Sequence, residues 1–188
     1  MATQTSSKRI SDLIIHDHAE LSDYYKQIKN AKDSETKAKW QNQFTWELAR
    51  HSIAEELVVY PAMEKYLGSN GKDMADHDRK EHRRLKEALY EFQNLSPSDS
   101  RFDSTIDKLV ADLDHHIREE EDDDLPTLEK ALTDAESQSI ANSFSRTKYF
   151  IPTRSHPSAP DRPPFETVVG LLAAPMDKLG DMFRKFPE

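Results

Sequence analysis

Apolar residues recur every three or four positions in four long stretches of the chain, which is the spacing of one face of an α-helix. We expect these stretches to form helices over residues 10–30, 36–67, 72–95 and 99–132. Ser11 or Asp12 is the expected N-cap of the first helix, and the turn signals GSNG and SPSDS end the second and third. Because short connections favour antiparallel neighbours, residues 1–133 are predicted to form an all-α, up-down-up-down four-helix bundle.

Residues 134–188 are predicted to form a C-terminal extension in three parts. ALTDAESQSIANSFSR has helical composition, so a short fifth helix is expected, with Asp134 as its cap. IPTRSHPSAPDRPP, residues 151–164, carries five prolines and is typical of an extended, proline-rich strap. FETVVGLLAAPMDKLGDMFRKF then returns to helical periodicity. This amphipathic terminal helix either docks on the bundle or serves a partner or a membrane surface.

Two segments of the chain share one unusual pattern. HSIAEELVVYP begins at His51 and HIREEEDDDLP at His116, so that both have His, two adjacent Glu and a final Pro at matching positions. Pro61 and Pro126 fall inside the second and fourth predicted helices. Proline lacks a backbone N–H and its ring clashes with the preceding turn, so each is expected to kink its helix or tighten a turn.

The composition excludes several classes of function. Charged residues make up 32% of the chain and apolar residues 36%, which favours helices over strands. A formal net charge of −9 argues against nucleic-acid binding, which needs a basic surface. The absence of cysteine excludes disulfides, thiolate zinc sites and iron–sulfur clusters. We find no signal peptide and no membrane-spanning run, and expect a soluble cytoplasmic protein without an integral membrane segment.

Each of the four apolar stripes passes through polar residues: His18; His51 and Glu55; Asp78 and His82; His116 and Glu120. An ionised carboxylate in an apolar interior costs on the order of several kcal/mol even after relaxation. No Lys or Arg lies on these inward paths near the carboxylates. A metal ion is therefore the expected counter-charge, and a structural bundle with satisfied core histidines is the alternative.

The spacing of these residues suits metal binding. In an HxxxE pair the side chains lie one helical turn apart, about 5 to 6 Å between Cβ atoms, and are able to chelate one ion or bridge two. His51 with Glu55 and His116 with Glu120 form two such pairs. DHAEL around His18 and EHRRL around His82 also correspond, so the duplication covers both halves of the predicted bundle.

Other polar residues near these motifs have two interpretations each. Glu56 and Glu121 are candidate substitutes for the favoured glutamates beside them. Asp78 is either a further metal ligand or the hydrogen-bond partner of a ligand histidine. EEEDDD, residues 119–124, lacks the glycine of a calcium-binding loop, and we interpret it as a solvated acidic face that offers a path for iron.

The remaining histidines are predicted to have no place in the site. His16, His77 and His115 lie off the inward stripes by helical geometry and are expected at the surface. His156 lies in the proline-rich strap and is expected in solvent.

The motifs together resemble the hemerythrin-like, or HHE cation-binding, domain over residues 10–130: DH at 17 and 18, HSIAEELVVYP, DHDRKEHRRLK and HIREEEDDDLP. The tail is similar to that of fungal members. The resemblance implies a four-helix bundle that holds a non-haem di-iron centre, bridged by two carboxylates and an oxo or hydroxo group. It implies Glu55 and Glu120 as the bridges, with terminal ligands His18, His51, His82 and His116. Oxygen-carrying hemerythrins place a fifth histidine where this chain has Asp78, which argues against reversible oxygen storage.

Mixed imidazole and carboxylate ligands suit Fe, or alternatively Mn, better than Cu(I) or a closed Zn site. The leading hypothesis is a binding protein whose two Fe ions bind dioxygen or sense iron, oxygen or oxidants. The alternative is a di-iron oxidase or monooxygenase acting on a small organic substrate, with the tail as a lid. The expected partner is dioxygen or another small molecule, and the sequence predicts no oligomeric state.

Overall fold

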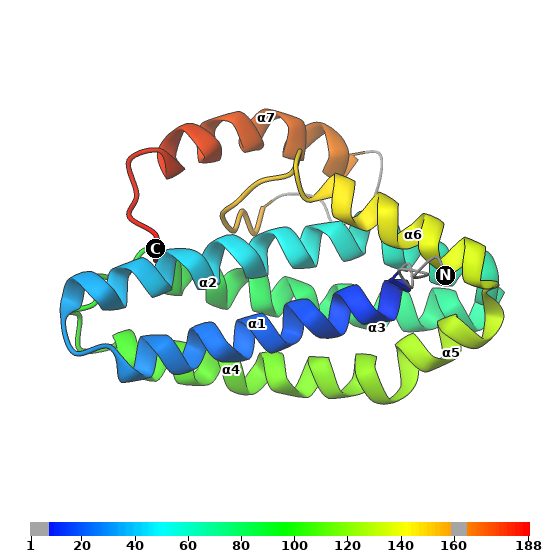
Figure 1. Ribbon diagram of the computed structural model, residues 1–188, viewed down its shortest axis with the longest axis horizontal. Coiled ribbons are helices and arrows are strands. Elements are labelled where there is room, and N and C mark those ends of the chain that lie inside the picture. The colour runs from blue at the N-terminus through cyan, green and yellow to red at the C-terminus, as the bar shows by residue number, and fades with distance from the viewer. Residues whose placement is uncertain (1–7, 159–164) are drawn as a thin grey trace, which may run out of the picture.

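The computed structural model describes residues 8–158 and 165–188, and describes side chains for 8–158 and 173–188. Every regular element in these ranges is a helix, which confirms the all-α prediction. Four long helices lie side by side along the longest dimension of the molecule: α1 (Ile10–Asn30), α2 (Ser34–Ala54), α3 (Tyr60–Gln93) and α4 (Phe102–Glu119) (Figure 1). They enclose the interior that holds the candidate site.

Two apolar clusters fill this interior, and a layer of polar side chains separates them. In α1, Ile14 belongs to one cluster and Leu21 to the other, and buried His18 lies between them. In α2 and α3, His51 and His82 also lie between the residues that each helix contributes to the two clusters. His116 lies between Leu113 of α4 in one cluster and Leu125, which follows that helix, in the other. The apolar layers above and below keep water away from these four rings.

The first helix spans the predicted range, but its cap differs from the prediction. Arg9 is the N-cap residue, and its backbone N–H donates to the Asp12 carboxylate over 2.9 Å. The helix starts at Ile10 because that side chain is fully buried and its backbone N–H donates to Ser137 Oγ over 3.0 Å. Asp12 therefore stabilises the first turn from inside the helix.

The GSNG turn interrupts the backbone where predicted, although helical hydrogen bonding resumes at once and α3 continues to Gln93. Gly68 has a φ of 61°, a conformation that side chains with a Cβ avoid. At Gly71 a Cβ would lie only 2.0 Å from the Met63 carbonyl oxygen. Both glycines are needed for this corner, one for its dihedral angle and one for close packing.

The two prolines follow turns that are wider than an α-helix, so the expected tightening is wrong. Five-residue π-helical turns, η1 (Glu55–Val59) and η2 (Glu120–Asp124), precede α3 and α5 (Leu125–Ala131). After each turn a backbone N–H bonds to the carbonyl five residues back, Tyr60 to Glu55 and Leu125 to Glu120. In the wider turn, the carbonyl group that would otherwise clash with the proline ring is moved away from it.

The extension begins with α6 (Asp134–Thr147), which Thr133 caps in place of the predicted Asp134. The Thr133 backbone N–H donates in turn to the Glu136 carboxylate, so this is a capping box. Residues 159–164 of the predicted strap lie outside the described residues. The terminal helix, α7 (Phe165–Asp181), lies above α2 (Figure 1).

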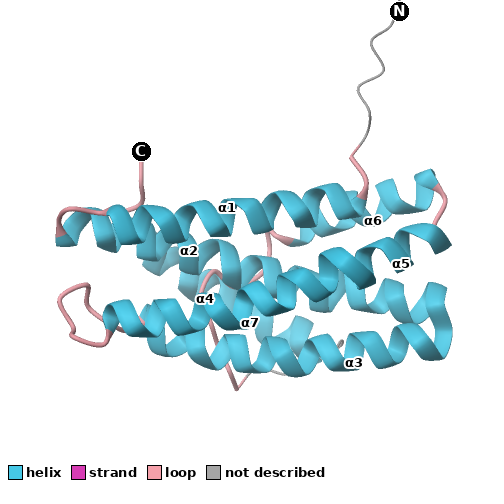
Figure 2. Cartoon of the chain, turned by 90° about the horizontal axis from the view of Figure 1, so that it is seen from below, coloured by secondary structure: helices cyan, strands magenta, loops and turns pink. Residues whose placement is uncertain are grey.

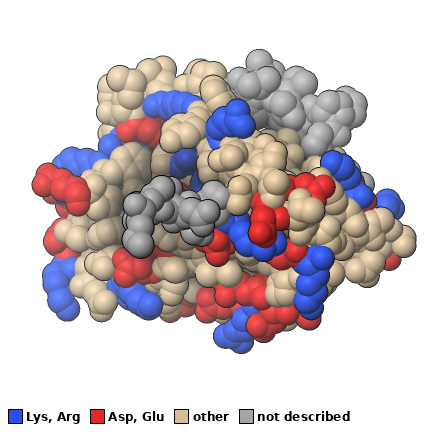
Figure 3. Space-filling view, turned by 45° about the vertical axis from the view of Figure 1, so that its right-hand side comes forward, with Lys and Arg blue, Asp and Glu red and all other residues tan. Residues whose placement is uncertain are grey.

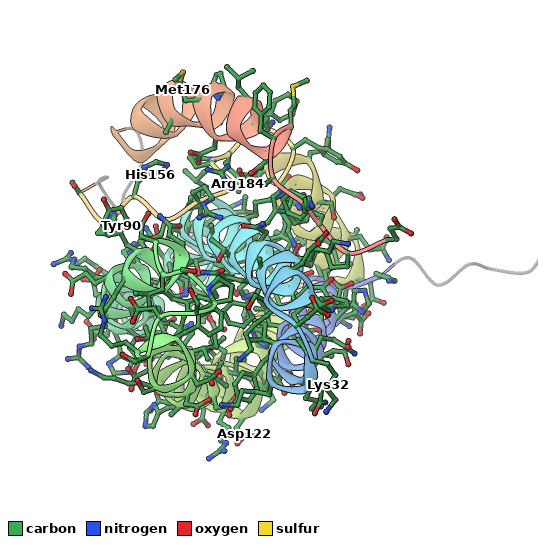
Figure 4. The ribbon with its side chains drawn as sticks, turned by 90° about the vertical axis from the view of Figure 1, so that its left-hand side faces the viewer. Lys32, Tyr90, Asp122, His156, Met176 and Arg184 are labelled. Carbon is green, nitrogen blue, oxygen red and sulfur yellow. The ribbon has the colours of Figure 1, made fainter. Side chains whose placement is uncertain are left out.

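The described part of α7 is held by polar contacts. Asp177 accepts hydrogen bonds from the backbone of Thr153 and Arg154, each over 3.1 Å. His156 Nε2 lies 3.0 Å from Asp177, so this histidine is partly buried beneath α7 instead of free in solvent. Met176 points away from the bundle (Figure 4), and the other exposed apolar side chains of this region are Leu179, Met182 and Phe183.

Figure 2 shows α5 and α6 at the end of the bundle where α1 begins, and both helices contact α1. On the face seen in Figure 3, acidic and basic side chains lie intermixed. Within residues 8–158 and 165–188, no helix combines the length and the apolar character needed to cross a membrane.

Candidate metal centre

The predicted inward residues all lie in the polar layer. His18, His51, His82 and His116 are at most 3% exposed, and the three carboxylates of Glu55, Asp78 and Glu120 at most 1%. This burial confirms the helical faces that the sequence pattern predicts. Burial alone does not show which ligand the layer is able to bind, because that depends on the positions of its donor atoms.

The layer divides into two groups that share their carboxylates. One group contains His18 and His51, the other contains His82 and His116, and Glu55 and Glu120 belong to both. Within each group, one donor atom from every residue lies within 4.8 Å of the others. Each group could therefore hold a cation, and Glu55 and Glu120 are common to both groups.

The inner nitrogen of each histidine faces one of the shared glutamates. Glu55 lies 3.2 Å from His51 Nε2 and 3.5 Å from His82 Nε2. Glu120 lies 3.4 Å from the Nε2 atoms of both His18 and His116. Each glutamate therefore contacts one histidine of its own half of the chain and one of the other half.

The outer nitrogen of each histidine is held by a second carboxylate. The Nδ1 atoms of His18, His51, His82 and His116 lie 2.8 to 3.1 Å from Glu121, Asp17, Glu56 and Glu81, respectively. Because an ionised carboxylate only accepts hydrogen bonds, each pairing favours a proton on Nδ1 and a lone pair on Nε2. Carboxylates in this position orient the imidazole ligands of metal ions.

These outer contacts explain why each motif contains two adjacent glutamates. Glu55 and Glu120 point to the inner layer, whereas Glu56 and Glu121, the candidate substitutes, contact histidines from the other half of the chain. The sequence prediction missed Asp17 and Glu81 in this role. Their signal was the acidic residue directly before His18 and before His82.

Two lysines, one partly buried and one buried, lie behind the outer carboxylates. Lys86 Nζ contacts Glu56. Lys148 Nζ lies 2.6 Å from Asp17 and also contacts Glu47. The sequence analysis expected no such cation in the interior, and Lys148 comes from the extension, which periodicity does not relate to the bundle. Among the described residues, neither Lys nor Arg forms an ion pair with Glu55 or Glu120.

The layer is left with unsatisfied polar atoms. Among the described side chains, nine buried polar atoms lack a hydrogen-bond partner, and seven of these belong to His18, His51, Glu55, Asp78 and Glu120. Natural structures contain few such atoms, and clusters of them indicate an absent ion or water. The donor set of imidazole nitrogens and carboxylate oxygens suits divalent iron or manganese. The residues therefore fit a pair of metal ions.

Protonation in the metal-free chain shows the same deficit of positive charge. Burial, together with the charge of Glu120, raises the pKa of Glu55 well above its usual value. Burial lowers the pKa of His116, but the charges of Glu120 and Glu81 outweigh it and raise this pKa to about 9. Burial lowers the pKa of His51 to about 4, so this ring is neutral at pH 7.

The two groups differ in the oxygen atoms near them. Asp78 lies close to His116, and burial, followed by the charge of Glu120, raises its pKa to about 8. Tyr60 is fully buried, with its hydroxyl 2.9 Å from His82 Nε2. The corresponding position of the other motif is Leu125. Sequence analysis missed Tyr60, although this difference between the two copies was its signal.

The acidic run over residues 119–124 is only partly a solvated face. Asp122 points outward (Figure 4). Glu120 is inside the polar layer, and Asp124 is 8% exposed with its pKa raised to about 6 by burial and by Glu120. The π-helical turn η2 spans this run and brings two of its members inward. The expected surface positions of His16, His77 and His115 are confirmed by their exposure.

The comparisons of this chain with a family profile and with a fungal protein agree on one family. The profile of the Hemerythrin HHE cation binding domain matches residues 9–128. An uncharacterized hemerythrin-like protein of Schizosaccharomyces pombe is 57% identical over 179 residues, which cover 95% of this chain and 88% of that protein.

Two more distant proteins also match. A DNA nickase of a Nostoc species is 25% identical over 155 residues, and the match covers 81% of this chain but 43% of the nickase. The crystal structure of a hemerythrin HHE cation binding domain-containing protein from Mycobacterium kansasii superimposes with a TM-score of 0.66 at 19% identity, covering 76% of this chain and 86% of that one. This last match supports the fold alone.

Proposed function

This chain belongs to the hemerythrin HHE cation-binding family, and from that premise we propose that it is a di-iron binding protein that binds dioxygen or senses iron, oxygen or oxidants. The observation that carries the proposal is the pair of cation positions that share Glu55 and Glu120. Among the described residues no Lys or Arg pairs with these two carboxylates, which leaves the histidines as their charge partners until a metal binds.

The proposal assigns His18 and His51 to one ion and His82 and His116 to the other, with Glu55 and Glu120 bridging both. Asp78 is the candidate additional ligand of the second ion, because its two carboxylate oxygens are buried without a partner. Manganese suits the same donors. When bound, two irons supply reversible electron exchange and an attachment point for dioxygen.

The protein's own residues prepare this site before any ion arrives. The outer carboxylates keep the Nε2 lone pairs turned inward, so little side-chain freedom is lost when a metal binds. The apolar clusters on both sides exclude water, which strengthens each charge interaction in the layer. The proposed frame is an up-down-up-down four-helix bundle over residues 1–133, with residues 134–188 as an extension that supplies Lys148.

Metal analysis with Mössbauer spectroscopy of the purified protein tests this proposal. We expect two irons per chain and the spectrum of a coupled iron pair. Glu55→Ala or His116→Ala should lower both iron stoichiometry and stability, since metal bound only by the folded state stabilises it. His16→Ala, at an exposed histidine, is the matched control. Unchanged iron in Glu55→Ala and His116→Ala would remove these assignments.

A second candidate function is a di-iron oxidase or monooxygenase. Asp78 and Tyr60 favour it, because they place hard oxygen atoms near one histidine pair only, and oxygen donors stabilise the ferric state. Anaerobic reduction followed by air separates the two functions. A long-lived change in absorption supports binding, whereas rapid oxidation coupled to turnover of an added organic substrate supports the enzyme.

A further inference from the structure

HxxxE pairs also occur on the outside of the molecule. The chain contains five of them, and the three outside the polar layer are His16 with Glu20, His77 with Glu81, and His115 with Glu119. The first stands alone on α1. The other two lie on α3 and α4, which pack against each other, and their side chains meet across the helix interface.

Four donor atoms converge at this interface. His77 Nε2 lies 3.2 Å from Glu119 Oε2 and 3.9 Å from Glu81 Oε1. His115 Nδ1 lies 3.7 Å from Glu81 Oε1 and 3.6 Å from Glu119 Oε2. The same two oxygen atoms therefore face both imidazoles, so the four atoms form a closed ring of alternating nitrogen and oxygen.

The nitrogen–oxygen separations in this ring are close to those found around a small divalent ion. Zinc binds imidazole and carboxylate at about 2.0 to 2.2 Å in tetrahedral geometry, which separates neighbouring donor atoms by roughly 3.4 Å. The observed separations of 3.2 to 3.9 Å are close to this value. Three of the four residues, His77, Glu81 and Glu119, already offer donor atoms within 4.8 Å of one another, and the His115 side chain has to rotate to join them around one ion.

We propose that His77, Glu81, His115 and Glu119 form a surface site for one divalent transition-metal ion of the zinc class. Two imidazoles and two carboxylates balance the charge of such an ion. The histidines are 57% and 67% exposed, so the ion reaches them from solvent. A cavity of about 320 Å³, lined by Glu81, His115 and Asp112 among others, opens beside the ring.

Glu81 connects this surface site to the buried layer. Its Oε1 faces the surface ring, while its Oε2 accepts from His116 Nδ1 over 3.0 Å. An ion on the surface would fix the carboxylate that orients His116. The surface site needs no iron in the interior, so a negative result for one of the two sites does not contradict the other.

Zinc titration by calorimetry, with Co²⁺ as a spectroscopic probe, tests the site on the full chain. The comparison is between the wild type and the double variant H77A/H115A. The wild type should bind one more equivalent of Zn²⁺, and its additional Co²⁺ should give the intense visible bands of four-coordinate cobalt. Because the count is a difference between two proteins, any metal taken up by the buried layer cancels.

Two further variants make the result specific. Glu119→Gln keeps both imidazoles and should weaken Zn²⁺ binding by more than the roughly 10–100-fold that loss of an outer partner costs. His16→Ala removes a histidine from the lone HxxxE pair and should retain the additional equivalent. Equal Zn²⁺ stoichiometry in the wild type and H77A/H115A, with circular dichroism showing both folded, would overturn the proposal.

Discussion

The HxxxE pairs inside the molecule and those on its surface have the same residues and the same spacing, yet their surroundings differ. The side chains of His51 and Glu55 are 2% and 0% exposed, whereas those of His77 and Glu81 are 57% and 16% exposed. At the surface, water solvates whichever charges remain. In the interior, the Nε2 atoms of His18 and His51 and the carboxylate oxygens of Glu55 are buried without a hydrogen-bond partner.

The difference shows that the motif alone does not define its chemistry. A cation stabilises a buried pair of this kind, because an ionised carboxylate without one costs on the order of several kcal/mol in the interior. An exposed pair folds equally well with or without one. Metal binding should therefore be linked to folding stability inside the bundle and nearly independent of it outside.

The largest expected effect comes from Glu55→Gln combined with Glu120→Gln. This variant should lose both buried metals and with them the metal-dependent gain in the free energy of unfolding, about 4 kcal/mol for each ion at a thousandfold excess over Kd. Its metal-free form should have nearly the free energy of unfolding of the metal-free wild type, because burial already keeps Glu55 protonated and the Glu120 charge is lost together with the proton of His116. Urea unfolding with and without Fe²⁺ measures the metal-dependent gain, and a gain in the variant equal to that of the wild type would contradict the argument.

Lys148→Met tests how far the buried pairs depend on the extension. Removal of the Lys148 ammonium group leaves Asp17 and Glu47 buried with one cation fewer. This loss should lower the free energy of unfolding by about 3 kcal/mol. Lys32→Met, at an exposed lysine (Figure 4), is the control. Equal midpoints of urea unfolding for these two variants would show that Lys148 is not part of the support.

Asp78→Asn addresses the pH dependence of the metal-free chain. The folded-state pKa of Asp78 is about 8 against a usual 3.8, so the folded state holds a proton that the unfolded state releases between these values. Stability should therefore fall as the pH rises through this window, at about 1.4 kcal/mol per pH unit. Asp78→Asn should remove this contribution to the change in the free energy of unfolding between pH 6 and pH 7, measured by urea unfolding. An unchanged pH dependence would mean that another residue holds the proton.

The smallest expected effect is that of His16→Ala. Its lone HxxxE pair is exposed, with 3.9 Å between His16 Nε2 and Glu20, and surface pairs of this kind contribute less than about 0.5 kcal/mol. Thermal unfolding and iron stoichiometry should both match the wild type. A large loss of either would mean that exposure does not separate the two kinds of pair.

The sequence predicted the inward faces of the helices well, because helical periodicity is a local property. His18, His51, His82 and His116 all lie where their stripes place them. The partners of these histidines were harder to predict. Asp17 serves a histidine of the next helix, and Glu56 one on α3, so no spacing along a single helix relates either residue to its partner.

Local backbone geometry was the other source of error. A proline inside a helix indicates a disturbed turn, but the sequence did not say that the turns before Pro61 and Pro126 widen into π-helical form. Whether such a turn widens depends on how the helices on both sides of it pack. Likewise the cap of α1 is at Arg9 because Ile10 is needed in the core.

By itself, the sequence determined that this protein is helical, that it repeats one histidine–glutamate pattern, and that those residues face inward, because each of these properties follows from spacing within one helix. Only the tertiary structure decided which glutamates are shared, which carboxylates hold the outer nitrogens, and that Lys148 reaches the interior from the extension. These contacts join segments far apart in the chain, and the free energy of a buried charge depends on everything that surrounds it.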